Sequence, residues 1–249
     1  MNKYIVAIFC ILQIFGVRAK DVDFAQANSA YSQKDYKKAQ DMYLQLIDAG
    51  NHDAYLYYNL GNTYVKLLDY PHAVLYYEKA LKINPQDKDI RNNLTYAYQK
   101  INSKYPDVAV EYPAATSDKA VSFFSISQWS KGMVIFLWIG VIFFLLYIFL
   151  SSQKKRRIAM MLTCSALIVS VFFLVMTFMR IQHDKVIQYV IVEDGEVYSK
   201  SDPSYNADNV YALVAGQKLK ILDQSGDWIK VRNGSGDIAW MTTQQGEKL

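Results

Sequence analysis

Two long uncharged apolar runs constrain the folding of this chain more than any other feature of its sequence. They cover residues 132–153 and 158–179, and each contains 22 residues without an Asp, Glu, Lys or Arg. A helix needs about 20 predominantly apolar residues to cross the hydrocarbon core of a bilayer. A buried helix of a large soluble domain is the alternative, but two adjacent runs of this length favour the bilayer. We therefore predict transmembrane helices at residues 131–152 and 158–179.

The formal net charge of the chain is +4, and its charges are distributed unevenly between the apolar and the hydrophilic regions. Residues 119–183 carry seven bases and no acid, whereas residues 20–118 carry 11 bases and 13 acids. Residues 184–249 carry seven bases and ten acids, so both hydrophilic regions are acidic. A nucleic-acid-binding protein places its bases on a folded surface to contact phosphates. We therefore exclude nucleic acid as a partner.

The N-terminus has the pattern of a secretory signal. Lys3 supplies a positive start, Tyr4–Val17 is apolar, and Val17 and Ala19 put small residues in front of a cleavage site. We predict that residues 1–19 are a signal peptide. An uncleaved anchor is the alternative.

The four bases Lys154–Arg157 fill the short loop between the predicted transmembrane helices. Short basic loops stay on the cytoplasmic side of a membrane. With the signal peptide exporting the N-terminal region, both acidic regions are expected outside the cytoplasm.

The first acidic region repeats itself at a spacing of 34 residues. The residues that recur are Asn28 and Asn62, Asp35 and Asp69, Tyr36 and Tyr70, Ala39 and Ala73, and Tyr43 and Tyr77. The second copy also carries a set of small, aromatic and proline residues at Tyr57, Leu60, Gly61, Tyr64, Ala73, Tyr77, Ala80 and Pro85. These residues resemble the tetratricopeptide repeat, a 34-residue pair of antiparallel helices. We predict a repeat domain at residues 20–102, with repeats at about 20–53 and 54–87 and a polar capping helix at 88–102.

Small and aromatic residues at these positions suit close helix packing, because Gly61 and Ala73 let helices approach while Tyr64 and Tyr77 fill the space between them. The resemblance implies that the other face of the first helices lines a concave groove for extended peptides or partner segments. An asparagine amide can donate and accept at once, which suits a ligand's peptide group. Alternatively, the asparagines only solvate the exposed helix faces. The candidate partner-binding residues are Asn28, Tyr31, Tyr55, Tyr58, Asn59, Asn62, Lys66, Asn93 and Tyr96.

Residues 103–130 are predicted to be a linker and interfacial segment. Pro106 and Pro113 lie in a stretch rich in Ala, Thr and Ser, a composition typical of flexible linkers. Phe124 and Trp129 then precede the first span, where aromatic residues suit the membrane interface. We expect the repeat domain to search for partners on this tether, and the C-terminal region to be held close to the membrane.

The second acidic region alternates between apolar and polar residues. This period of two predicts strands at residues 218–221, 228–232 and 238–241, separated by turns at 224–227 and 233–236. The order of strands, glycine turns and tryptophans resembles the bacterial SH3-like barrel, which we predict at residues 186–245. Such modules commonly bind cell-wall or peptide ligands, although Val197–Pro203 departs from the usual ligand-loop sequence.

The sequence contains no recognisable catalytic pattern. Its three histidines, His52, His72 and His183, lie in separate segments without metal-ligand spacing. There is no glycine-rich phosphate loop and no paired nucleophile and base. We predict that the protein is not an enzyme and needs no metal or cofactor.

The predicted fold class is mixed: an α-helical tetratricopeptide repeat domain, two transmembrane helices and a small all-β SH3-like barrel. This architecture resembles the BatE-type proteins of the bacterial aerotolerance operon. The resemblance implies a multi-pass protein of the bacterial cytoplasmic membrane with both terminal domains periplasmic. It also implies a scaffold for protein partners, among them von Willebrand A-type membrane proteins and MoxR-type ATPases, in stress tolerance. The alternative is an envelope sensor whose barrel binds peptidoglycan or peptide.

Overall fold

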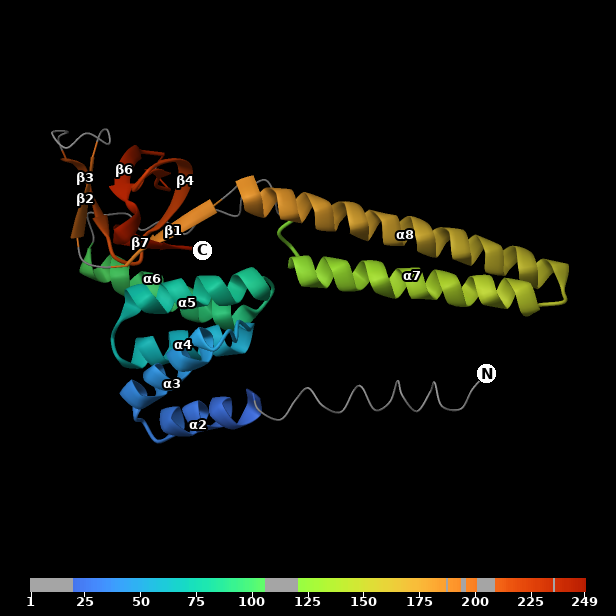
Figure 1. Ribbon diagram of the computed structural model, residues 1–249, viewed down its shortest axis with the longest axis horizontal. Coiled ribbons are helices and arrows are strands. Elements are labelled where there is room, and N and C mark those ends of the chain that lie inside the picture. The colour runs from blue at the N-terminus through green and yellow to red at the C-terminus, as the bar shows by residue number, and fades with distance from the viewer. Residues whose placement is uncertain (1–19, 106–120, 187, 194–195, 201–208, 235) are drawn as a thin grey trace.

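The computed structural model describes residues 20–105, 121–186, 188–193, 196–200, 209–234 and 236–249, which form a head and one long helical hairpin (Figure 1). The predicted signal peptide lies outside the described residues. So do most of the predicted linker, with Pro106 and Pro113, and the end of the Val197–Pro203 run.

Five helices stack antiparallel in the repeat domain: α2 (Lys20–Ser32), α3 (Tyr36–Asp48), α4 (Ala54–Lys66), α5 (Tyr70–Ile83) and α6 (Lys88–Lys104). An aspartate precedes each of the last four and accepts a hydrogen bond from a backbone N–H of the first turn. Such N-caps satisfy donors that the helix itself leaves unpaired. The spacing of these aspartates along the chain therefore sets where the helices begin.

The predicted packing of the second repeat is confirmed. Tyr57, Leu60, Gly61 and Tyr64 are all buried on α4. A Cβ atom at Gly61 would lie 2.6 Å from Cε1 of Tyr77, closer than side chains can pack. The bare backbone of Gly61 therefore lets the Tyr77 ring lie between α4 and α5.

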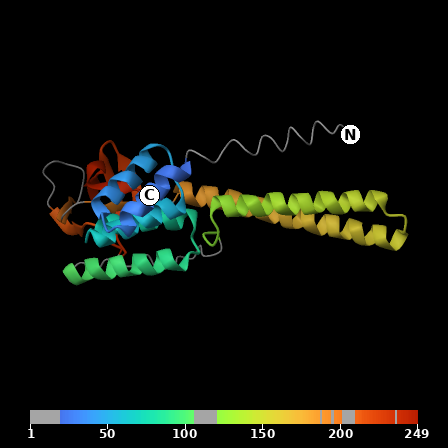
Figure 2. The same cartoon turned by 90° about the horizontal axis from the view of Figure 1, so that it is seen from below.

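Helices α7 (Ile126–Phe149) and α8 (Gln153–Val186) lie side by side and form the hairpin (Figure 2). Both are long and apolar enough to cross a membrane. Their large apolar side chains face outward, with Trp138 62% exposed and Phe178 61% exposed. This pattern, opposite to that of a helix in water, suits contact with lipid.

The hairpin differs from the predicted boundaries at both ends. Helix α7 begins at Ile126, inside the predicted linker, because Ser125 caps it. The bases Lys154–Arg157 lie in the first turns of α8 rather than in a loop. Lysine and arginine are good helix formers, so the helix begins as soon as the short Leu150–Ser152 connection allows.

Aromatic rings pack at the open end of the hairpin, and a hydrogen bond joins this end to the head. Trp129 contacts Phe124 and Phe173 edge-on, with ring centroids 4.9 Å and 5.4 Å apart, and its indole N–H donates to the carbonyl of Val121 at 3.2 Å. The side chain of Gln86, in the loop after α5, donates to the carbonyl of Phe123 at 3.1 Å. This segment is therefore tied to the repeat domain as well as to the hairpin.

A seven-stranded antiparallel sheet forms the barrel, in the order β3-β2-β6-β5-β4-β1-β7. Its strands are β1 (Gln188–Val192), β2 (Glu196–Lys200), β3 (Asn209–Val214), β4 (Lys218–Ser225), β5 (Trp228–Arg232), β6 (Ile238–Thr242) and β7 (Gly246–Lys248), with the short helix η1 (Thr243–Gln245) before β7. The three predicted strands are present as β4, β5 and β6. The sequence did not predict β2, β3 or β7, which lie outside the alternating stretch and pair with neighbouring strands.

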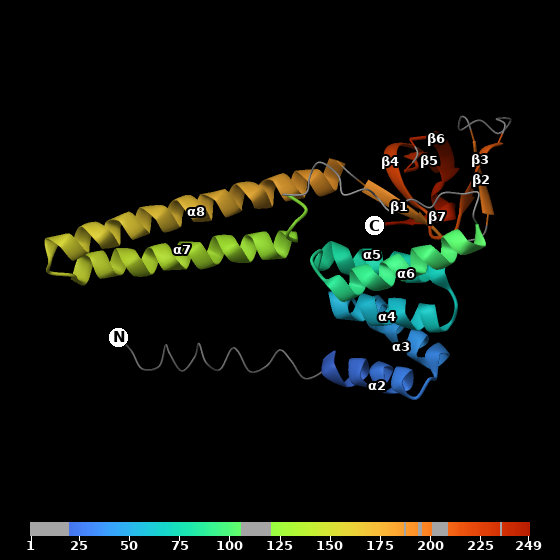
Figure 3. The ribbon, with the colours of Figure 1, turned by 180° about the vertical axis from the view of Figure 1, so that it is seen from behind.

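The repeat domain and the barrel pack against each other, which the sequence did not predict. Figure 3 shows β1 and β7 beside α5 and α6. Ile191 and Val214 of the barrel are buried in the hydrophobic core of the repeats, while the barrel's own core is formed by Val190, Val192, Leu213, Leu219, Ile229, Val231 and Met241. The expectation of a freely searching repeat domain is therefore wrong for this arrangement.

Candidate protein-interaction site

The candidate site is the face of the repeat domain formed by α2, α4 and α6, the first helices of successive repeats. The nine predicted residues all lie on these helices. The structure divides them into two groups: residues bonded to one another across helices, and residues exposed beside them.

The first group begins with Asn28 on α2. Its side-chain oxygen accepts a hydrogen bond from the hydroxyl of Tyr43 on α3 at 2.6 Å. The same oxygen accepts from the side-chain amide of Asn59 on α4 at 3.0 Å. One asparagine oxygen thus connects three helices.

Asn62 repeats this arrangement 34 residues later in the sequence. Its side-chain oxygen accepts from the hydroxyl of Tyr77 on α5 at 2.7 Å and from the amide of Asn93 on α6 at 2.8 Å. The Asn93 amide also donates to the hydroxyl of Tyr58 at 3.2 Å. We call the two sets, Asn28–Tyr43–Asn59 and Asn62–Tyr77–Asn93, the amide ladder.

The ladder tyrosines act as donors because an asparagine side-chain oxygen only accepts. Burial raises the pKa of Tyr43 to about 12, and it also raises the pKa of Tyr77. Both hydroxyls therefore stay protonated well above neutral pH, so each can donate to its asparagine. The asparagines are thus structural members of the repeat as well as residues of the face formed by α2, α4 and α6.

The second group lies beside the ladder and is open to a partner. Tyr55 is 72% exposed and Lys66 is exposed, and neither side chain makes a hydrogen bond or ion pair within the described residues. Tyr96 is 43% exposed and makes an edge-on contact with Tyr70 at 6.3 Å. Lys100, which the sequence did not single out, lies 5.2 Å from the centre of the Tyr96 ring.

Tyr31 and Tyr58 lie between these two groups. Both are half-buried. Tyr31 contacts Tyr36 edge-on at 5.4 Å, and Tyr58 packs against Tyr77 at 6.1 Å. Burial raises the pKa of Tyr31. Each of these half-buried rings therefore packs on a tyrosine of the following helix, Tyr36 on α3 or Tyr77 on α5.

The sequence missed Tyr43 and Tyr77 as members of the site. Their signal was present, because they recur at the same 34-residue spacing as Asn28 and Asn62. A side chain that repeats in register with a groove residue, but on the second helix of the pair, is a natural bonding partner for it.

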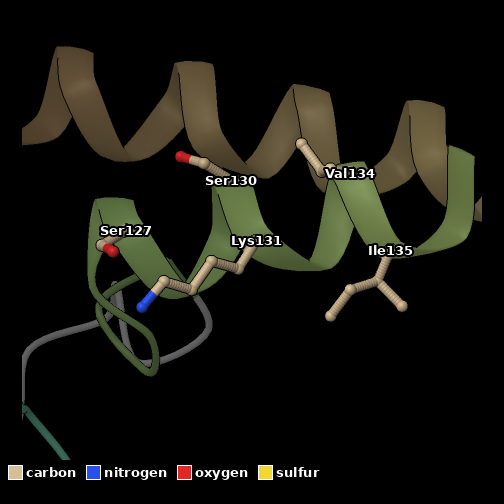
Figure 4. Close-up of a pocket in the computed structure, with 5 residues that line it drawn as sticks. All are labelled: Ser127, Ser130, Lys131, Val134 and Ile135. Carbon is tan, nitrogen blue, oxygen red and sulfur yellow. The ribbon is translucent and has the colours of Figure 1, made fainter. Parts of the chain in front are cut away.

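An open hollow of about 450 Å³ lies on α7 near the start of the hairpin (Figure 4). Its lining residues are Ser127, Ser130, Lys131, Val134 and Ile135. The Ser130 hydroxyl is bonded to the backbone carbonyl of Ile126 at 2.5 Å. The apolar side chains of Val134 and Ile135 give the hollow a wall that suits contact with lipid.

Within the part of the chain that the structure describes, no three His, Cys, Asp or Glu side chains come together to hold a metal ion.

Comparison with known families identifies two modules in the chain. The family model of the tetratricopeptide repeat matches residues 54–87, which are helices α4 and α5 with their flanking turns. The family model of the bacterial SH3 domain matches residues 197–244. A search of curated proteins found no match. Modules of both kinds are typically non-catalytic and bind proteins or peptides, and the SH3 module also suits peptidoglycan.

Proposed function

We propose that this protein is a non-enzymatic, membrane-anchored adaptor whose concave repeat face binds an extended segment of a protein partner. The observation that carries the proposal is the pairing of a fixed amide ladder with the exposed side chains of Tyr55, Lys66 and Tyr96. The ladder holds the floor of the groove rigid, so binding costs little ordering of the site. Exposed aromatic rings on a rigid floor are typical anchors of protein interfaces.

The hairpin supports a location in the bacterial cytoplasmic membrane. With the bases Lys154–Arg157 on the cytoplasmic side, the repeat domain and the barrel both lie in the periplasm. The resemblance to BatE-type proteins then favours von Willebrand A-type membrane proteins as partners, in an aerotolerance or envelope-stress complex. Reporter fusions after Asp118 and Leu249 should be active only outside the cytoplasm, and a fusion after Gln153 only inside.

The groove is tested by changing the exposed residues and leaving the ladder intact. The double variant Tyr55→Ala/Lys66→Ala should lose co-purifying membrane partners from the detergent-solubilised full chain, with its unfolding midpoint unchanged. Truncating an aromatic anchor costs about 2 kcal/mol or more of binding free energy. Changes at Tyr58 or Asn62 are unsuitable because these residues bond across helices.

Lys38→Ala, at an exposed lysine of α3, is the matched control and should retain the partners. Equal retention by the double variant would reject the groove as the binding site.

An envelope sensor that binds peptidoglycan through the barrel is the second candidate, favoured by the match to the bacterial SH3 domain. Trp228 and Trp240 are half-exposed on adjacent strands, and Lys230 lies 5.8 Å from the centre of the Trp240 ring. Co-sedimentation of the solubilised chain with purified peptidoglycan, abolished by Trp240→Ala, would support this reading. Partner loss in Tyr55→Ala/Lys66→Ala without sedimentation would reject it.

A further inference from the structure

The end of the repeat stack formed by α5 and α6 is not open to solvent. Helix α6 corresponds to the first helix of a third repeat, and the next described helix, α7, belongs to the hairpin. Yet the side of α6 that a second helix would cover is buried, with Tyr98 0% and Ile101 3% exposed. Something other than a repeat helix therefore covers this surface.

The 34-residue register shows which contacts a second helix would make with α6. Tyr64 of the second repeat stacks on Tyr76 and His72 of its partner helix α5, at 5.4 Å and 5.0 Å. Tyr98 is its counterpart 34 residues later. Its hydroxyl lies 3.2 Å from Oε1 of Glu78, and Oε2 of Glu78 accepts from Lys218 of the barrel at 2.7 Å.

The burial of helix α5 also indicates that something covers this end of the stack. Residues 73–78 are buried one after another, which is more than a full turn, so α5 is covered on all sides. In the first repeat, the counterpart helix α3 buries only one stripe: Ala39, Tyr43 and Leu46. The additional cover on α5 comes from the barrel.

The barrel presents a matching surface of apolar residues and charges. Ile191 and Val214 enter the core of the repeats, and Lys218 and Glu247 pair with the neighbouring α5 residues Glu78 and Lys79. Gly216 has a φ of +86°, and a Cβ atom there would lie 2.4 Å from Cδ1 of Ile101. Backbone of the barrel thus lies directly on α6, at a distance that only glycine permits.

We infer that the barrel completes the repeat domain by docking where the second helix of the third repeat would pack. The two segments on either side of the hairpin therefore form one module, and the barrel, rather than α6, caps the stack. A repeat stack needs such a cap because each repeat is stabilised by its neighbours. The polar face of α6, with Arg91, Asn92 and Gln99 exposed, remains on the other side.

Carbodiimide cross-linking of the full-length protein in membranes tests the docking. The reagent joins a lysine amine to a contacting carboxylate, so peptides linked through Glu78–Lys218 and Lys79–Glu247 are expected by mass spectrometry. Lys218→Arg keeps the charge but cannot form this amide, so it should lose the first link and keep the second. Absence of both links from the unmodified protein would overturn the inference.

Capping is tested by hydrogen exchange in two glycine variants. Gly216→Ala should lose both links and speed amide exchange in α6, because the new methyl group collides with Ile101 and Pro71. Gly226→Ala is the matched control: Gly226 also has positive φ, +59°, but nothing lies within 4 Å of its added Cβ. The control should keep both links, and amide exchange in α6 should stay as slow as in the unmodified protein.

Charge reversal keeps the inference testable if Gly216→Ala does not fold. Lys218→Glu and Glu78→Lys should each speed exchange in α6, and the double exchange of charges should restore slow exchange. Loss of the links with unchanged exchange in α6 would show contact without capping and overturn the proposed role. None of these residues belongs to the partner-binding group, so a failure here leaves the groove proposal standing.

Discussion

The two repeats are built on one plan and differ in their surroundings. Both begin their second helix with an aspartate cap, and both bond an asparagine to a tyrosine and to the first helix of the next repeat. The outer side of α3 is exposed at Asp41, whereas its counterpart on α5, Leu75, is 1% exposed. The comparison teaches that the internal packing of a repeat follows its own sequence, while the residues on its outer face follow the neighbour.

The largest expected effect comes from giving the second repeat the residue of the first. Leu75→Asp should lower the free energy of unfolding by about 4 kcal/mol, because it removes a buried apolar side chain and buries a carboxylate in its place. Denaturant unfolding of the solubilised full chain, followed by tyrosine fluorescence, measures this loss.

The reciprocal change, Asp41→Leu, should stay within about 0.5 kcal/mol of the parent because the position is exposed. Similar losses of unfolding free energy in the two variants would mean that the barrel does not cover the second repeat more than the first.

The amide ladder should matter equally in both repeats. Asn62→Ala leaves the buried Tyr77 hydroxyl without its acceptor, which should cost about 2 kcal/mol of unfolding free energy. Asn28→Ala should cost about the same through Tyr43. Thermal unfolding of both variants checks the equality. An unchanged midpoint in either variant would show that its asparagine only solvates the helix face and does not stabilise the repeat.

Helix packing at Gly61 gives a smaller effect. The first repeat carries Ala27 at the corresponding position. Replacing a helical glycine with alanine ordinarily stabilises by about 1 kcal/mol, but the added Cβ of Gly61→Ala would collide with the Tyr77 ring. Overpacking costs about 1–3 kcal/mol, so we expect a net loss of about 1 kcal/mol in chemical unfolding. A net gain would show that the ring can move aside.

The smallest effect is a dependence of stability on alkaline pH. The pKa of Tyr43 is raised from 10.0 to about 12 in the folded protein, so the folded state binds its proton more tightly than the unfolded state does. Its contribution is complete below pH 10 and is lost as the pH rises through about 12. Tyr43→Phe should flatten the fall of the unfolding midpoint over this range, and so should Tyr77→Phe. A slope unchanged in both variants would contradict the protonated ladder.

Most of the repeat fold could be predicted because its signals are local and periodic. The 34-residue spacing, the Gly61–Tyr77 packing and the two apolar runs each depend on residues close in the sequence. The docking of the barrel could not be predicted, because a glutamate and a lysine such as Glu78 and Lys218 are expected at the surface when each is taken alone, whereas Glu78 is buried in the structure. One local clue did exist: Leu75 replaces Asp41 at the same repeat position, and an apolar residue on an outward face indicates a neighbour.

The candidate site was predicted by residue but not by role. Asparagines at groove positions predicted contact with a ligand, but the structure shows them bonded between helices. The oxygens of Asn28 and Asn62 accept from tyrosines and from the side-chain amides of Asn59 and Asn93. The exposed residues Tyr55 and Lys66 then become the better candidates for direct contact. Sequence spacing identifies the face of a helix, but hydrogen bonds between helices depend on packing that spacing does not specify.

The ion pair between Lys79 and Glu247 joins residues 168 positions apart, and the whole hairpin lies between them. A ribosome therefore delivers the barrel only after both apolar helices have been synthesised. During biogenesis, the α5–α6 end therefore stays uncovered until the hairpin and the last strands have been synthesised. With the proposed topology and capping, closure of the head would act as an assembly checkpoint: a chain whose second apolar helix failed to cross the membrane would leave its barrel on the other side, and its repeat domain would lack the cap.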